Sequence, residues 1–162
     1  MERLSRSGFK VVPDGSILAR YGNPNACYYG AQIQVQIEYT AIPKIEFVLS
    51  EEKIASEHDI DGAEDIVSGK DLPRTFQLAM FSGVEEVYSK NTSKEGIKFT
   101  LLKAAIHSMD SNEMAFKLAG QIALAGWYQS QLGSGEMSLT YNKLYYKCPN
   151  LFKSLDEDDK NI

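Results

Sequence analysis

The stretch of residues 31–39 constrains the fold of this chain more than any other, because its side chains alternate strictly in polarity. Four positions carry large apolar or aromatic side chains (Ile33, Val35, Ile37 and Tyr39), and the residue before each of them is polar: Gln32, Gln34, Gln36 and Glu38. A period of two places the apolar side chains on one face of a β-strand and the polar ones on the other. We therefore expect a sheet with one buried and one wet face, and a well-specified strand register.

Three further segments have the composition of strands. Residues 9–21 predict a hairpin, because Pro13-Asp14-Gly15 lies between two apolar pairs and provides the residues that a tight turn requires. Two short apolar runs, residues 45–49 and 97–102, predict one strand each. The acidic segment 51–71 lacks regular periodicity, and we expect it to be a surface excursion.

Two segments instead repeat their apolar residues at spacings of three and four, the period of a helix with one buried face. In the first, Asp71 is a suitable N-cap, Pro73 lies in the first turn, and the helix should end near Tyr88. The second should begin at Asp110, which can form a capping box with Glu113. The residues expected to face the core are Phe76, Met80, Val84 and Val87 in the first helix and Met114, Leu118, Ile122 and Ala125 in the second.

The order of these elements, strands followed by helix, strand and helix, predicts an α+β protein. We expect a two-layer sandwich, in which two helices cover one face of a mostly antiparallel sheet. A chain of 162 residues has the size of one domain, which we place at residues 1–150. Residues 151–162 are acidic, and we expect them to form a disordered tail.

The sequence around the second helix resembles a known family. Residues 100–120, which read TLLKAAIHSMDSNEMAFKLAG, are similar without a gap to the second strand, loop and helix of domain IV of translation elongation factor G. In that family the helix begins D-S-S-E-M-A-F-K-I-A-G and follows a loop with a histidine, whose position His107 occupies. Leu72-Pro73-Arg74-Thr75-Phe76 and Tyr29-Gly30 resemble two further family motifs, I-P-K-x-Y and Y-G. The resemblance covers roughly residues 27–128.

The resemblance implies a four-stranded sheet with two helices on one face and a left-handed β-α-β crossover, which the usual handedness rule would not predict. It also implies a function. In elongation factor G this domain resembles a tRNA anticodon arm and reaches into the decoding site of the small ribosomal subunit, while a separate domain hydrolyses GTP. The chain contains no G-x-x-x-x-G-K-[ST] motif. We therefore expect a non-catalytic, stand-alone domain that binds the ribosome or another structured RNA and needs no cofactor.

The tip loops, with which the family contacts RNA, differ in this sequence. Residues 23–30 contain no basic residue, and Lys103-Ala104-Ala105 replaces an Asp-Gly turn before the histidine. The candidate contact residues are His107, Lys103, Arg20, Tyr28 and Tyr29, because aromatic rings stack on bases and cations bind phosphates. Each also has an ordinary structural interpretation: a solvent-facing or capping histidine, scattered surface cations, and half-buried tyrosines that pack within the fold.

The formal charge of −5 does not exclude an RNA partner, because the acidity is concentrated. Residues 51–71 carry a net charge of −6 and residues 156–160 carry −3, so the remainder of the chain has a net charge of +4. A mildly basic body can still neutralise phosphates. The acidic segment admits two interpretations, a solvated excursion or a binding site for a cation or a basic partner.

The sequence gives little support for a metal site or for a catalytic nucleophile. Two cysteines, Cys27 and Cys148, and two histidines, His58 and His107, are too few and too dispersed for a zinc site. Cys27 with His107 lacks a third residue to orient the histidine, so we do not expect an enzyme. No membrane-spanning run or signal peptide is evident, which makes the cytoplasm the expected location.

A second function from a different class stays open. The altered tip loops, the acidic segment and the aromatic stretch 139–146 are also compatible with a protein-interaction or homo-oligomeric module that reuses the fold. In that case Tyr141, Tyr145 and Tyr146 would contribute to the contact. The ribosome or another RNA is the favoured partner, because the family resemblance is the one positive signal.

Overall fold

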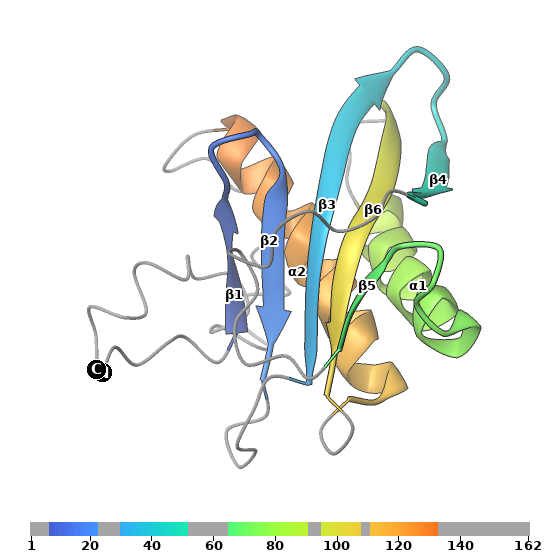
Figure 1. The fold of residues 1–162 in the computed structure, drawn as a ribbon. Helices are drawn as coiled ribbons and strands as arrows, with labels where there is room; N and C mark the ends of the chain where they lie inside the picture. The colour runs from blue at the N-terminus through green and yellow to red at the C-terminus, as the bar shows by residue number, and fades with distance from the viewer. Residues whose placement is uncertain (1–6, 23–29, 52–64, 91–94, 108–110, 133–162) are drawn as a thin grey trace.

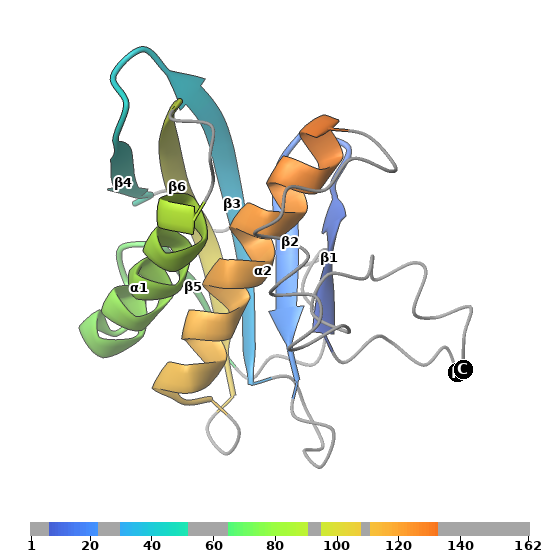
Figure 2. The ribbon, with the colours of Figure 1, turned by 180° about the vertical axis from the view of Figure 1, so that it is seen from behind.

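The computed structural model describes residues 7–22, 30–51, 65–90, 95–107 and 111–132 (Figure 1). Several residues singled out in the sequence lie outside this part of the chain: Cys27, Tyr28, Tyr29, His58, Asp110, Tyr141, Tyr145, Tyr146, Cys148 and the tail 151–162. The described elements pack as two layers, a sheet and a pair of helices that cover the same face of it (Figures 1 and 2). The expected α+β sandwich is confirmed.

Among the described residues, six strands form a single mixed sheet. In spatial order they are β1 (Ser7–Val11), β2 (Ile17–Tyr21), β3 (Ala31–Thr40), β6 (Gly96–Ile106) and β4 (Ile45–Leu49), and β5 (Asp65–Ser68) also pairs with β6. The neighbours are antiparallel except for β4 and β6, which are parallel. The expected four-stranded sheet is too small, because the N-terminal hairpin joins it and because β5 lies in the acidic segment that we interpreted as an excursion.

β6 changes its partner halfway along one side. Its first half pairs with β4 and its second half with β5. At Leu102, between the two halves, the register against β3 shifts by one residue, as in a β-bulge. Here the carbonyls of Leu101 and Leu102 accept hydrogen bonds from the N–H groups of Ser50 and Gly69, at 3.0 and 3.2 Å. The strand is also longer than predicted, since Lys103-Ala104-Ala105, which we expected in a loop, belongs to β6.

Two helices, α1 (Arg74–Lys90) and α2 (Glu113–Leu132), lie side by side on the sheet in the described part of the chain (Figure 2). α1 lies on the connection between the parallel strands β4 and β6. In Figure 2 the helices face the viewer, both strands run downward and β4 lies to the left of β6, so the crossover is left-handed. The handedness implied by the family resemblance is present, although nearly all such units have the opposite hand.

Both helices begin later than their capping signals predicted. Asn112, not Asp110, caps α2, because its side-chain oxygen accepts a hydrogen bond of 2.7 Å from the N–H of the third helical residue. Before α1, Pro73 takes the cap position and its carbonyl accepts a bond of 3.0 Å from the N–H of Gln77. Asp71 belongs instead to the turn that precedes the helix. The helices were predicted correctly, but their first residues were not.

The core lies between the helices and the sheet. α1 buries Met80, Val84 and Val87 as predicted. In α2, Ile122 and Ala125 are buried as predicted and Leu118 packs against the core, but Met114, also predicted to be buried, is 60% exposed. The buried side of α2 is wider than predicted and also includes Ala115, Phe116, Ala119 and Ala123. The ring of Phe116 stacks on that of Phe76, with centroids 4.6 Å apart, and so joins the two helices.

The two helices also touch through their backbones. A Cβ atom added to Gly83 would lie 2.1 Å from the carbonyl oxygen of Lys117, and one added to Gly120 would lie 2.4 Å from that of Met80. Both distances are far below van der Waals contact. The helices can therefore lie this close only because glycine occupies both positions.

The face of the sheet turned away from the helices, here called the far face, is not uniformly wet. Gln32 and Gln34 are buried, whereas Glu38, further along β3, is exposed. Gln34 donates a hydrogen bond of 2.7 Å from Nε2 to Oγ of Ser16. A second, smaller apolar cluster on this face consists of Val12, Leu18 and Ala105, with Ile66 packed against it. The alternation in β3 thus predicted the strand correctly but not the burial of its polar side.

Candidate nucleic-acid interface

Three strands and a helix meet at one end of the sheet, which we call the tip end. β2 ends there at Tyr21, β3 begins opposite it at Ala31, and β6 ends at Ile106 shortly before α2 begins. Both helices start toward the tip end and run away from it (Figure 1). Because the N-terminus of a helix carries a partial positive charge, this arrangement directs two such charges toward the tip end.

Ser111 holds the two connections at the tip end together. Its hydroxyl accepts a hydrogen bond from the N–H of His107 and donates one to the carbonyl of Gly30, each at 2.8 Å. The N–H of Ser111 also donates to the carbonyl of His107 at 2.9 Å. Gly30 in turn donates to the carbonyl of Tyr21 at 2.9 Å. The start of β3 and the end of β6 are thus linked by residues that lie 81 positions apart.

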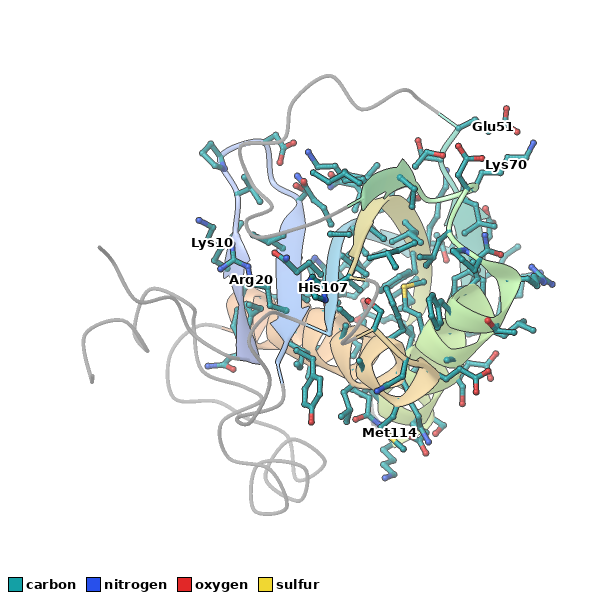
Figure 3. The ribbon with its side chains drawn as sticks, turned by 60° about the horizontal axis from the view of Figure 1, so that its bottom comes forward. Lys10, Arg20, Glu51, Lys70, His107 and Met114 are labelled. Atoms are coloured by element: carbon teal, nitrogen blue, oxygen red, sulfur yellow. The ribbon has the colours of Figure 1, made fainter. Side chains whose placement is uncertain are left out.

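His107 directly follows β6, and only 8% of its surface is exposed (Figure 3). The structure does not show a solvent-facing histidine, and the cap of α2 is Asn112. Instead, the backbone of His107 is joined to Ser111 in the turn that precedes α2. A contact between His107 and RNA stays a prediction.

The two predicted cations, Arg20 and Lys103, lie on strands rather than in the tip loops. Arg20 is on β2, opposite Gln32, and is 3% exposed. Lys103 is on β6, opposite Gln34, and is half-buried. Both positions fall on the far face. Arg20 lies on the predicted hairpin, whereas the loop placement expected for Lys103 is wrong. A binding role of either residue stays a prediction. Tyr28 and Tyr29 lie outside the described residues.

Lys103 also influences the hairpin turn between β1 and β2. Oδ1 of Asp14 accepts hydrogen bonds from the hydroxyl and the N–H of Ser16, at 2.6 and 2.9 Å. These two bonds, with a smaller contribution from the charge of Lys103, hold the pKa of the Asp14 carboxyl below its ordinary value. The charge of Lys103 on the far face is therefore accompanied by the negative charge of the Asp14 carboxylate.

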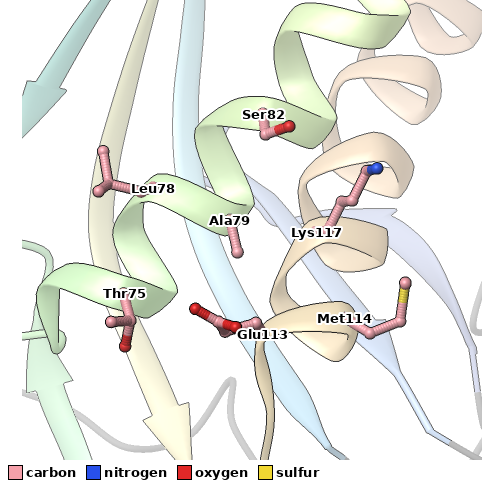
Figure 4. A pocket seen from close by; sticks show the side chains of 7 residues that line it. All are labelled: Thr75, Leu78, Ala79, Ser82, Glu113, Met114 and Lys117. Atoms are coloured by element: carbon pink, nitrogen blue, oxygen red, sulfur yellow. The ribbon is translucent and has the colours of Figure 1, made fainter.

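A groove of about 370 Å³ lies on the outer side of the helix pair (Figure 4). Its lining consists of Thr75, Leu78, Ala79 and Ser82 from α1 and Glu113, Met114 and Lys117 from α2. Leu78 and Met114 are 51% and 60% exposed, which is high for large apolar side chains. Sequence patterns did not predict this groove, because they place Met114 in the core.

No group of three or more His, Cys, Asp or Glu side chains suited to a metal ion occurs within the described residues. The described helices also include none that is both long and apolar enough to cross a membrane.

The fold and the tip end together define a two-layer α+β domain built around a left-handed β-α-β unit. Residues 61–130 match the family model for elongation factor G, domain IV. The matched segment contains β5, α1, β6 and most of α2. The resemblance to this domain seen in the sequence is thus confirmed over these residues.

A solved structure from Thermus thermophilus is also similar to this chain. The alignment covers 66% of this chain and 14% of that chain, with 18% sequence identity and a TM-score of 0.42. The chain thus spans a small part of the length of that relative.

Proposed function

We propose that this chain is a non-catalytic, translation-related domain that binds the small ribosomal subunit, or another structured RNA, through its tip end. The observation that carries the proposal is that the family match falls on the elements that build the tip end, β6 and α2 among them. On this proposal the protein acts in the cytoplasm, requires no cofactor and catalyses no reaction.

The geometry of the tip end supports an RNA ligand. Structured RNA is recognised mainly through its shape and its phosphates, which favours a rigid surface with positive potential over a deep pocket. The hydrogen bonds of Ser111 supply rigidity, and the two helix N-termini supply partial positive charge. Rigidity and positive potential are the two properties that this mode of RNA binding requires.

Each predicted contact residue has a place in this proposal. Tyr28 and Tyr29 directly precede Gly30 in the sequence and are the candidates for stacking on bases. Lys103 and Arg20 contribute positive potential from the far face. His107 supports the connection between β6 and α2 from its buried position.

Co-sedimentation with purified small ribosomal subunits tests the proposal. We expect the protein to sediment with the subunits at low salt and to be released as the salt concentration rises, because phosphate contacts displace counterions. Lys103→Ala should weaken binding and lower the salt slope by about 1. Lys44→Ala is the matched control, because Lys44 is exposed and its carbonyl bonds to Ile97, at the end of β6 remote from the tip end.

Two results would contradict the proposal. The first is a protein that binds neither small subunits nor a structured RNA at low salt. The second is an equal loss of binding in the two lysine variants, which would place the contact away from the tip end and the adjoining far face.

A protein-interaction module is the second candidate function, and the groove between the helices is the observation that favours it. Exposed Leu78 and Met114 are of the kind that a partner protein buries. If this function is the correct one, the full chain forms a homodimer or binds a protein through the groove or through Tyr141, Tyr145 and Tyr146. Sedimentation equilibrium should then show a dimer that Leu78→Glu with Met114→Glu dissociates. A monomer at every concentration would count against the homo-oligomer.

A further inference from the structure

The linkage made by Ser111 uses its side chain both as a donor and as an acceptor. A hydroxyl carries one proton, so it can donate a single hydrogen bond while it accepts others. Here it donates to the carbonyl of Gly30 and accepts from the N–H of His107, each at 2.8 Å. Without the hydroxyl, both backbone groups lose this partner.

Both backbone partners belong to buried residues. Gly30 is buried, and so is His107. A backbone group that loses its partner in a buried position costs more free energy than one that water can reach. Loss of the Ser111 hydroxyl is therefore expected to destabilise the backbone at Gly30 and His107, or to make it move until both groups find other partners.

The two partners also fix the frame of the tip end. Gly30 bonds to Tyr21, so its position sets where the chain re-enters the sheet as β3. His107 follows the last residue of β6, so its position sets where the chain leaves the sheet toward α2. The Ser111 linkage therefore sets the separation of these two points.

We propose that Ser111 is a positioning residue for RNA binding: it holds Gly30 and His107 at a fixed separation and so keeps the two strand ends in the geometry that a structured RNA requires. The inference rests on the proposed function, since it names the residue on which that binding depends. Ser111 need not touch the RNA. Its contribution is made through the backbone of its two partners.

A graded series of variants tests the inference by two independent measurements. The series is Ser111→Thr, which keeps the hydroxyl, Ser111→Cys, which keeps a weak donor and acceptor, and Ser111→Ala, which keeps neither. Lys44→Ala, at an exposed position remote from the tip end, is the control. Amide hydrogen exchange at His107 reports the bond to Ser111 directly, and exchange at Gly30, whose amide bonds to Tyr21, reports whether the start of β3 loosens. The affinity for small ribosomal subunits reports the binding.

We expect exchange at both amides to rise about tenfold in Ser111→Ala, less in Ser111→Cys and little in Ser111→Thr, with no change in the control. Affinity for the small subunit should fall in the same order, by about tenfold in Ser111→Ala. Far-UV circular dichroism identifies any variant that is not folded. If Ser111→Ala does not fold, the comparison of Thr with Cys decides the question, because both keep a side chain of similar size.

The outcomes separate the two proposals. Faster exchange with unchanged affinity, in variants of a wild-type chain that binds, would overturn the positioning role and leave the proposed function intact. Unchanged exchange at His107 in Ser111→Ala would overturn the linkage itself, because the His107 amide is the donor to the Ser111 hydroxyl. A wild-type chain that does not bind small subunits or structured RNA would overturn the proposed function, and the positioning role for RNA would fall with it, whatever the exchange rates show.

Discussion

Gly83 and Gly120 decide how closely the two helices pack. A Cβ atom at Gly83 would meet the carbonyl oxygen of Lys117, which belongs to helix backbone and cannot rotate away as a side chain would. The same holds for Gly120 and the carbonyl of Met80. Any larger residue therefore forces the helices apart and weakens contacts such as the Phe76–Phe116 stack.

We predict that Gly83→Ala lowers the free energy of unfolding by about 2 kcal/mol, because the separation of the helices outweighs the better helix propensity of alanine. Urea denaturation measures the change. Ser82→Ala is the control on the same helix, and its effect should stay within about 0.5 kcal/mol. Equal free energies of unfolding for the two variants would show that α1 and α2 can move apart without loss of stability.

Asp14 gives the hairpin turn a dependence on pH. Its pKa in the folded protein is lowered by the hydrogen bonds from Ser16, so the bonds stabilise the turn above the ordinary value of 3.8 and are lost as the pH falls through the lower folded value. We predict that exchange of the Ser16 amide accelerates below that pH. NMR from neutral pH to about pH 2 measures it. Asp14→Asn, which does not titrate, should remove the step, and a step that persists would assign it to another group.

At the scale of elements, β4 is attached to the domain through Phe47. Its ring stacks on Phe81 of α1 with centroids 4.1 Å apart and meets the edge of Phe99 of β6 at 6.0 Å. β4 also pairs in parallel with β6, and Ile45 and Leu49 pack against the core. One side chain thus joins β4 to both layers.

Phe47→Ala should therefore lower the free energy of unfolding by about 2–3 kcal/mol, somewhat less than for a fully buried phenylalanine. Val48→Ala, the next position in β4, lies on the far face and should cost about 1 kcal/mol. Urea denaturation compares the two variants. A small effect of Phe47→Ala would mean that β4 opens independently of the rest of the sheet.

Periodicity predicted the long elements because burial follows one face of each. β3 and α1 illustrate this, since Ile33 and Met80 fall on the expected stripes. β5 was missed because four residues within an acidic segment are too few to show alternation. Met114 was misplaced because α2 begins at Glu113, capped by Asn112, and the direction in which its first turn points depends on packing against α1. Sequence patterns hold no information on such contacts.

The candidate site was less predictable than the fold. The family resemblance pointed to His107. Nothing in the sequence motif shows that Ser111 links two strand ends rather than caps the helix. Ser111 could be identified only from its bond to Gly30, because the two residues meet through the register of β3 and β6. The burial of Arg20 could not be predicted either, because the partial burial of the far face is not encoded in the alternation of β3.

At the scale of the whole molecule, the domain boundary at residue 150 stays a prediction that a truncation can test. Residues 151–162 hold four acidic and two basic residues, so a chain that ends at Asn150 has a net charge of −3 instead of −5. If the segment adds nothing to the core, the urea midpoint should not change. Binding to ribosomal subunits at low salt should tighten slightly, since repulsion from the phosphates is reduced. A lower midpoint would show that the segment packs on the domain and that the boundary is wrong.

β6 has a consequence for the order in which this protein can form. Of the described strands it is the last to be synthesised, yet it is the partner of β3, β4 and β5, which all precede it. The meander of β1, β2 and β3 can pair as soon as it leaves the ribosome, because each of its strands follows its partner directly. β4 and β5 must wait with open edges until residues 96–106 emerge, and open strand edges are prone to aggregate. Translation that pauses just before β6 would therefore expose this chain to misassembly more than a pause at any earlier strand.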